Sequence, residues 1–276
     1  MQVQKWAAFS DGIAGGNPAG IVLAETFPSE TEMRALAAEL GFSETAFAVQ
    51  TGERWRVRYF SPESEVPFCG HATIALGAAL ATGHGDGRFD LSLNHGDISV
   101  EGRRDGALVS AALQSPPTRS RALDAERLAE VLAVFGYRED QLDPRLPPAW
   151  IHGGADHVAL CLRSRADLSA LHYDLDRGRM LMNREGWVTV LFAVIETPQR
   201  FHTRNAFASG GVYEDPATGA ATAAFAGYLR DVRWPHQGAI DLIQGEDMGM
   251  RSLLHADIPA TPGSSIRVSG TARLMS

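Results

Sequence analysis

Two stretches of this chain repeat one another, and both carry residue types suited to acid–base chemistry. The stretch from Glu65 to Leu80 matches the stretch from Glu214 to Leu229 without a gap. The matched pairs are Glu65/Glu214, Pro67/Pro216, Gly70/Gly219, Ala72/Ala221, Thr73/Thr222, Ala75/Ala224 and Leu80/Leu229. One such repeat in a chain of 276 residues predicts two related halves that face each other. The chemistry of the halves could differ at three unmatched positions, which are Cys69, His71 and Asp215.

Each copy places a proline and a glycine just before an apolar helix. The first N–H groups of a helix have no acceptor within the helix, and its N-terminus carries a partial positive charge. Two such N-termini directed at one cleft would bind a small carboxylate. The alternative is a structural duplication in which both helix ends are capped and occluded.

Three side chains near these helix starts are candidates for catalysis. Glu44 stands among apolar neighbours, where a desolvated carboxylate can serve as a general acid or base. His71 follows Gly70 in the first turn, where the helix dipole favours a neutral imidazole that can donate or accept a hydrogen bond. Asp215 directly precedes Pro216 and could cap the second helix. Each also has a structural interpretation: an exposed strand residue, a core histidine and an ordinary cap.

Composition and motifs exclude several other classes of function. The net charge is −8 with interleaved signs, which argues against a nucleic-acid or anionic-membrane partner. The sequence has no long apolar span, no secretory-signal pattern at its start and only two cysteines, so a cytoplasmic protein is expected. It also contains no metal-ligand spacing, phosphate loop or nucleophile elbow. We therefore predict no metal and no cofactor.

The hydrophobic pattern predicts the elements that position these residues. Residues 15–20 are expected to form a tight loop, because this segment is rich in glycine and proline. Strands are expected at residues 3–7, 21–23, 43–49, 54–60, 88–93, 97–101, 107–113, 156–163, 187–195, 240–243 and 266–268. Helices are expected at residues 33–40, 72–81, 128–135, 175–183 and 220–228. The helices at 72–81 and 220–228 are apolar all round and should each be wrapped by a sheet.

This order of elements predicts a duplicated α+β unit. The N-terminal half should comprise residues 1–115, with the last strand, 263–276, returning to it. The C-terminal half should comprise residues 116–262, and Ser115-Pro116-Pro117 is the expected linker.

The chain resembles the PhzF family, the phenazine-biosynthesis isomerase-like proteins, over nearly its whole length. The motifs that carry the resemblance are Gly16-Asn17-Pro18-Ala19-Gly20, Ser43-Glu44-Thr45-Ala46-Phe47, Arg58-Tyr59-Phe60-Ser61-Pro62, Pro67-Phe68-Cys69-Gly70-His71-Ala72-Thr73, Glu214-Asp215-Pro216-Ala217-Thr218-Gly219, and Gln244-Gly245 with Gly249. The resemblance implies a diaminopimelate epimerase-like fold. This fold has two pseudo-symmetric domains, each a rolled, mostly antiparallel sheet around a central helix, with the active site between them.

The resemblance also implies roles for individual residues. Glu44 matches the glutamate that moves a proton between two carbons of a small acid without a metal or cofactor. His71 and Asp215 match its supporting residues. The positions expected to bind substrate are Asn17, Gly70, Thr218, Gly219 and Ala220. A homodimer is expected on the same basis.

The chain departs from the family pattern at two places. The family commonly has Gly-Ser-Ala where this chain has Gly219-Ala220-Ala221, so a hydroxyl that could contact the substrate is missing. The family's Gly-Arg pair is here Gly249-Met250-Arg251, which moves the arginine by one residue.

We therefore expect a cofactor-independent isomerase that acts on a small carboxylate-bearing metabolite in the cleft between the halves. One alternative is a cysteine-dependent amino-acid epimerase or racemase that uses Cys69. That enzyme would need a second thiol, yet the matching position is Thr218, and Cys161 lies far from both repeats in the sequence. The other alternative is a non-catalytic protein that binds a small acid on the same fold.

Overall fold

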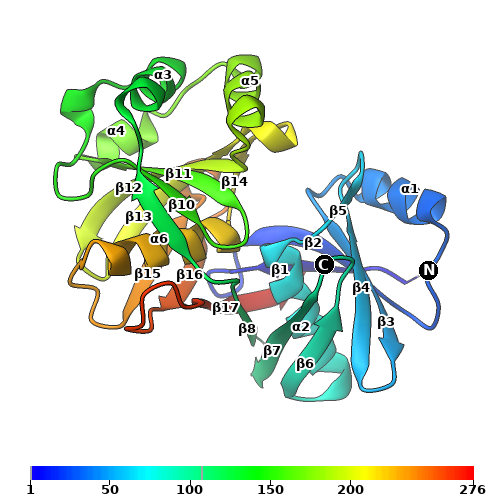
Figure 1. The fold of residues 1–276 in the computed structure, drawn as a ribbon. Coiled ribbons are helices and arrows are strands. Elements are labelled where there is room, and N and C mark those ends of the chain that lie inside the picture. The colour runs from blue at the N-terminus through cyan, green and yellow to red at the C-terminus, as the bar shows by residue number, and fades with distance from the viewer. Residues whose placement is uncertain (1, 107) are drawn as a thin grey trace. The chain divides into compact units, whose positions relative to one another are not determined.

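The structure, a computed structural model, describes residues 2–106 and 108–276. The chain forms two compact units (Figure 1). Unit 1 comprises Met1–Gln114 and Ser269–Ser276, and unit 2 comprises Ser115–Val268. The predicted boundaries followed residue 115 and residue 262, whereas unit 1 ends at Gln114 and resumes at Ser269. The expected strand 107–113 starts at a residue outside the described part of the chain.

Unit 1 is a closed ring of strands around one helix. Its strands are β1 (Gln4–Ala8), β2 (Asn17–Ala24), β3 (Thr45–Thr51), β4 (Arg54–Phe60), β5 (Glu65–Val66), β6 (Gly87–Ser92), β7 (Asp97–Asp105), β8 (Leu108–Gln114) and β17 (Arg267–Leu274). They pair in the order β1-β2-β3-β4-β6-β7-β8-β17, and β17 pairs with β1 to close the ring. The pairs β2–β3 and β4–β6 are parallel. Helix α2 (Gly70–His84) packs against β1, β2, β7 and β8.

Unit 2 repeats most of these pairings around helix α6 (Gly219–Asp231). Its strands are β9 (Arg119–Ala122), β10 (Ala149–His152), β11 (Asp156–Leu162), β12 (Thr189–Thr197), β13 (Arg200–Phe207), β14 (Val212–Asp215), β15 (Ala239–Gln244) and β16 (Ser252–Asp257). The pairs β11–β12 and β13–β15 are parallel, in the positions that β2–β3 and β4–β6 occupy in unit 1. Helix α6 packs against β9, β10 and β16. The predicted duplicated α+β fold is therefore confirmed.

The remaining helices cover the outer faces of the sheets. Helix α1 (Glu30–Leu40) has Ser29 as its N-cap, in a capping box with Glu32, and ends at Gly41 in the left-handed conformation. In unit 2, α3 (Ala125–Phe135), α4 (Arg165–Ser169) and α5 (Leu175–Glu185) pack with β11 and β12 around Phe135 and Phe192. Short 3-10 turns lie at Glu139–Gln141, Ala208–Gly210 and Glu246–Met248.

Both central helices are buried, and glycines let the strands approach them closely. Every residue of α2 from His71 to Ala81 is buried. A Cβ atom added at Gly77 of α2 would lie 2.5 Å from Cγ2 of Val100 on β7. A Cβ atom added at Gly153, next to β10, would lie 2.8 Å from the backbone nitrogen of Ala224 on α6. Small residues at these contacts are thus a packing requirement in both units.

The structure corrects three local predictions. Residues 15–20 are not one tight loop: only Gly15 and Gly16 have positive φ, and β2 already begins at Asn17 because β1 and β3 pair with it from both sides. Glu44 lies just before β3 and not within it. The sequence pattern gave no sign of β13, because the polar residues Arg204 and Asn205 are buried on its two opposite faces.

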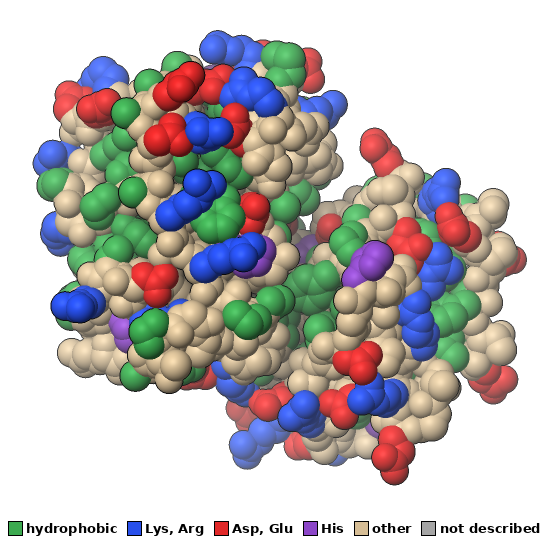
Figure 2. Space-filling model, viewed as in Figure 1, with side chains coloured by type: hydrophobic (Ala, Val, Ile, Leu, Met, Phe, Trp, Pro, Cys, Tyr) green, Lys and Arg blue, Asp and Glu red, His purple; other side chains and the backbone are tan. Residues whose placement is uncertain are grey.

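The surface agrees with the interleaved charges of the sequence. On the face drawn in Figure 2, basic and acidic side chains are interspersed over each unit. None of the helices in the described part of the chain has the length and hydrophobicity needed to cross a membrane.

Candidate active site

The first candidate site lies at the start of α2 in unit 1. The helix begins at Gly70, and its N-cap residue, Cys69, has an extended backbone and, among the described residues, makes no side-chain capping hydrogen bond. His71 occupies the first turn and is 5% exposed. The N-terminal N–H groups of a helix that is not capped by a side chain remain able to bind an acceptor.

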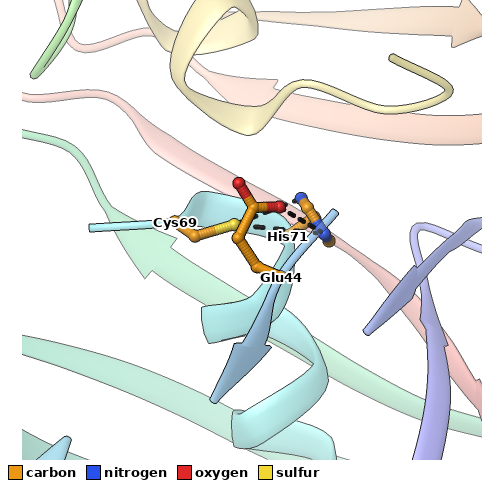
Figure 3. A group of neighbouring side chains, drawn as sticks. All are labelled: Glu44, Cys69 and His71. Atoms are coloured by element: carbon orange, nitrogen blue, oxygen red, sulfur yellow. Dashed lines mark hydrogen bonds and ion pairs between the residues drawn. The ribbon is translucent and has the colours of Figure 1, made fainter. Parts of the chain in front are cut away.

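Glu44, His71 and Cys69 converge at this helix start (Figure 3). Oε2 of Glu44 lies 3.5 Å from Nε2 of His71, and the two side chains are 12% and 6% exposed. Sγ of Cys69 lies 3.3 Å from Nδ1 of His71. Oγ of Ser43 lies 3.3 Å from Nε2 of the same ring. A neutral imidazole with the proton on Nε2 can donate to Glu44 and accept the Cys69 thiol proton at Nδ1.

The backbone around these side chains is held by buried hydrogen bonds. Thr73 donates its hydroxyl to the carbonyl oxygen of Cys69 at 2.6 Å, and the hydroxyl oxygens of Thr73 and Tyr59 are 2.7 Å apart. Burial raises the pKa of Tyr59 well above its ordinary value, so this hydroxyl stays neutral. The amide of Gly20 on β2 donates to the carbonyl oxygen of Glu44 at 3.3 Å. Hydrogen bonds from β2, β4 and α2 therefore hold the backbone of Glu44 and of Cys69 in place.

The second candidate site lies at the start of α6 in unit 2. Asp215 ends β14 and is 6% exposed. Thr218 is the N-cap of α6, but its hydroxyl donates to Oδ2 of Asp215 at 2.6 Å and does not cap the helix. The side-chain amide of Gln244 donates to the carbonyl oxygen of Asp215 at 2.7 Å. Thr218, and not Asp215, is therefore the N-cap residue of α6, and Asp215 binds the Thr218 hydroxyl.

A chain of buried polar side chains continues from Gln244 into the core of unit 2. Nδ2 of Asn205 donates to Oε1 of Gln244 at 3.2 Å, and the hydroxyl of Thr189 donates to Oδ1 of Asn205 at 3.3 Å. Nδ1 of His157 lies 2.8 Å from the Thr189 hydroxyl. Burial lowers the pKa of His157 from 6.5 to about 3, with a smaller contribution from His152. His157 is therefore neutral and adds no positive charge to this network.

An arginine–glutamate ion pair links the short strand before each central helix to the neighbouring strand of the sheet. In unit 1, Arg58 of β4 donates to both carboxylate oxygens of Glu65, at 2.8 and 2.5 Å. In unit 2, Arg204 of β13 makes the equivalent contacts with Glu214, and these side chains are 8% and 3% exposed. The repeat thus conserves Glu65 and Glu214 as strand anchors, each a few residues before its helix start.

The other predicted substrate-binding residues lie at the same helix starts or on the adjacent strand. Asn17 begins β2 and is 2% exposed, while Ala220 is half-buried in the first turn of α6. Gly70 and Gly219 are the first residues of their helices. Arg251 precedes β16, and its Nε lies 3.3 Å from Oε1 of Glu246.

Sequence reasoning missed part of both sites. It considered Cys69 only as the thiol of an alternative epimerase and not as a contact of His71, and it gave no role to Ser43 or Asn205. The Gln244-Gly245 motif was the only sequence signal for the Gln244 contacts. Cys161 is buried within β11, and burial raises the pKa of its thiol well above the ordinary value. Neither it nor Thr218 supplies a reactive second thiol at the α6 start.

Comparison with known proteins places the chain in a family. Residues 6–276 match the PhzC-PhzF family model, described as phenazine biosynthesis-like protein. The chain is 29% identical to the uncharacterized isomerase YddE of Escherichia coli K12, covering 99% of this chain and 96% of that protein. It is 31% identical to trans-2,3-dihydro-3-hydroxyanthranilate isomerase of Pseudomonas chlororaphis, covering 90% and 87%.

A solved structure supports the same fold. The Bacillus anthracis phenazine biosynthesis protein of the PhzF family superposes with a TM-score of 0.86 at 21% identity, covering 100% of this chain and 98% of that one. The match of family model, curated relatives and fold agrees with the resemblance that the sequence motifs indicated. The chain therefore belongs to the PhzC-PhzF family of phenazine biosynthesis-like proteins and is an isomerase.

Proposed function

We propose that this isomerase moves a proton between two carbons of a small carboxylate-bearing metabolite, without a metal or cofactor, and that Glu44 carries the proton. The observation that carries the proposal is the position of Glu44: a carboxylate only 12% exposed, 3.5 Å from a buried histidine, at the start of a buried helix. A carboxylate so placed is partly shielded from water and held in one orientation, as a general acid or base requires.

In this mechanism Glu44 removes a proton from a carbon next to an unsaturated or carbonyl system. It then returns the proton to another carbon on the same face of the substrate. His71 donates a hydrogen bond to Glu44 while that carboxylate is ionised, and Ser43 and Cys69 hold the ring. The electron pair of the broken C–H bond moves into the neighbouring unsaturated system, and a new C–H bond forms where the proton returns, so the substrate undergoes no net oxidation or reduction. Glu44 starts and ends the cycle as a carboxylate.

The N–H groups at the starts of α2 and α6 are proposed to bind the substrate carboxylate. Each start has an N-cap side chain that is engaged elsewhere: Cys69 with His71, and Thr218 with Asp215. The first-turn amides and the positive end of each helix dipole are then available to an anion. We propose that both helix starts serve one substrate molecule, with Asp215 orienting it.

The substrate class follows from the same features and from the named relative. A relative 31% identical to this chain is named for a dihydro-hydroxyanthranilate, which is a small cyclic acid. We propose a substrate of that size, with a carboxylate and a C–H bond activated by neighbouring unsaturation. Ala220 contributes no hydroxyl in the first turn of α6, so a substrate that needs no hydrogen bond from this position is favoured.

The proposal is tested by incorporation of solvent deuterium into candidate acids. Glu44→Gln keeps the side-chain shape but cannot accept a proton, so it should lower exchange by about 10²–10⁴-fold, the usual contribution of a positioned acid or base. Circular dichroism and the melting temperature should stay close to those of the wild type. Glu53→Gln is the matched control, since Glu53 is exposed in the turn between β3 and β4. Exchange that survives in Glu44→Gln would remove Glu44 from the mechanism.

A further inference from the structure

The hydrogen bonds that run through the core of unit 2 to the start of α6 can carry their hydrogens in only one order. We call this network the polar chain. It links the side chains of His157, Thr189, Asn205, Gln244, Thr218 and Asp215. All of them except Thr218 are at most 6% exposed. Polar groups buried so deeply must satisfy one another, because bulk water does not reach them.

The carboxylate of Asp215 sets the order at one end of the polar chain. An ionised carboxylate only accepts hydrogen bonds, so the Thr218 hydroxyl donates to Oδ2 of Asp215. That hydroxyl has a single hydrogen, so it accepts from Nε2 of Gln244, which lies 3.1 Å away. Two backbone groups require the same orientation of the Gln244 amide. Its Nε2 donates to the carbonyl oxygen of Asp215 at 2.7 Å, and its Oε1 accepts from the backbone N–H of Thr218 at 3.3 Å.

The order then continues to the histidine at the far end. Oε1 of Gln244 accepts from Nδ2 of Asn205, which turns Oδ1 of Asn205 toward Thr189 as an acceptor. The Thr189 hydroxyl donates its only hydrogen to Asn205, so it must accept from Nδ1 of His157. His157 therefore carries its proton on Nδ1.

The other ring nitrogen of His157 supports this assignment independently. Nε2 is buried and has no hydrogen-bond partner among residues 2–106 and 108–276. A proton on Nε2 would leave a buried N–H group without an acceptor, and such groups are rare in folded proteins. A lone pair in that place is the less costly arrangement.

We propose that the polar chain is polarised in one direction, with every hydrogen pointing toward the Asp215 carboxylate, and that the four members behind Thr218 are positioning residues for that carboxylate. Aligned hydrogen bonds strengthen one another, and donors directed at a carboxylate favour its ionised form. Gln244 holds both the backbone of Asp215 and the hydroxyl that binds its side chain, so the carboxylate is fixed in one orientation. The consequence for catalysis rests on the proposed role of Asp215 in orienting the substrate.

Nuclear magnetic resonance of the full chain, labelled with ¹⁵N at histidine, tests the direction without any substrate. At about pH 8, where an unperturbed histidine is neutral, long-range ¹H–¹⁵N spectra should show the His157 proton on Nδ1. The exposed His95 should instead show the averaged signals of a ring that exchanges its proton between both nitrogens. His157→Asn identifies the His157 signals by removing them. A wild-type proton on Nε2 of His157 would overturn the proposed direction.

Substitutions at Thr189 test the positioning role, because three other side chains separate its hydroxyl from Asp215. Thr189→Val keeps the shape and removes the hydroxyl. It should lower kcat for solvent-deuterium incorporation by about 3–10-fold with little change in KM, as expected for one lost hydrogen bond. Thr189→Ser should restore the rate. Thr203→Val is the matched control, since Thr203 is also buried in unit 2 and its hydroxyl has no hydrogen-bond partner in the described part of the chain.

Two further variants distinguish positioning from a general loss of structure. Gln244→Met keeps the side-chain length but breaks the polar chain at its centre, so it should lower kcat by at least ~10²-fold. In an Asp215→Asn background, Thr189→Val should have little further effect, because the polar chain acts through Asp215. Melting temperatures check that each variant is folded.

An equal loss from Thr189→Val in both backgrounds, or equal activity of Thr189→Val and Thr203→Val, would overturn the positioning role. Wild-type protein that exchanges no candidate acid would instead overturn the proposed function. The spectrum of His157 still decides the direction of the polar chain in that case, so the two failures are distinguishable.

Discussion

At the scale of single residues, each helix start owes its chemistry to a few buried side chains that hydrogen bonds hold in place. His71 is held by Ser43 and Cys69 and lies beside Glu44. In unit 2, Asp215 is held by Thr218, whose hydroxyl also accepts from Gln244. Side chains with several hydrogen bonds have little rotational freedom, so these groups are oriented before any ligand arrives. Orientation of this kind is what a positioned acid or base requires.

His157 gives the first residue-scale prediction, which concerns the dependence of stability on pH. Its pKa in the folded protein, about 3, lies below its ordinary value of 6.5. Between these values the unfolded chain binds a proton that the folded chain does not, so the free energy of unfolding falls as the pH is lowered. The stability that neutral His157 contributes is complete above pH 6.5 and is lost as the pH approaches 3. The expected slope is at most ~1.4 kcal/mol per pH unit.

The measurement is urea unfolding of the wild type and His157→Asn across this range. The side-chain amide of Asn lies near the position of Nδ1 and can bond the Thr189 hydroxyl, but it does not titrate. The variant should therefore lose less stability per pH unit than the wild type, by up to ~1.4 kcal/mol. His95→Asn, at an exposed turn, is the matched control. Parallel curves for the wild type and His157→Asn would show that this histidine does not contribute to acid sensitivity.

At the scale of elements, the two central helices depend on close contact with the strands around them. Gly77 and Gly83 lie on the same helix, α2, but in different surroundings. A Cβ atom at Gly77 would lie 2.5 Å from Val100, whereas a Cβ atom at Gly83 would meet nothing within 4 Å. Alanine substitutions at these two glycines therefore distinguish the effect of close packing on stability from the effect of helix propensity.

We expect Gly77→Ala to destabilise the protein by about 1–3 kcal/mol, because overpacking forces β7 away from the helix. Gly83→Ala should be neutral or stabilising by up to ~1 kcal/mol, since alanine favours the helix and has room here. Chemical denaturation of both variants measures the difference. If the two substitutions have the same effect, close packing of α2 against β7 is not a determinant of stability.

At the scale of the whole molecule, the duplication produced two units with one topology but different side chains at their helix starts. Unit 1 presents Glu44, Cys69 and His71, and unit 2 presents Asp215, Thr218 and Gln244. The arginine–glutamate anchors Arg58–Glu65 and Arg204–Glu214 are common to both. Duplication has therefore kept the scaffold and diversified the side chains at the two helix starts.

Asp215→Asn tests whether the halves serve one substrate. If they do, this variant should lose at least ~10²-fold in kcat/KM, although Glu44 is intact. The double variant with Glu44→Gln should then lose much less than the product of the two single effects, because groups on one reaction path act as a unit. Asp140→Asn, at an exposed position, is the control. Single variants that each keep about half of the activity would instead indicate two independent sites.

The sequence alone predicted the family, the duplicated fold and the isomerase class, all of which are confirmed. The family and the isomerase class came from the resemblance carried by short local motifs, whereas the duplicated fold rested on the repeated Pro and Gly before each apolar helix and on the apolar runs of α2 and α6. It also singled out Glu44, His71 and Asp215, whose roles stay predictions, as do the homodimer and the substrate.

Only the tertiary structure decided which of these side chains touch. Strand pairing between β2 and β3 and the start of α2 bring Glu44 to His71 although 26 other residues separate them in the chain. The same is true of His157, Thr189, Asn205 and Gln244, which come from four different strands of unit 2. Contacts of this kind depend on strand register and on packing between distant segments, and neither leaves a periodic signal in the sequence. Hydrophobic periodicity determines which segments become helices and strands, whereas close packing of the folded chain determines which polar groups meet.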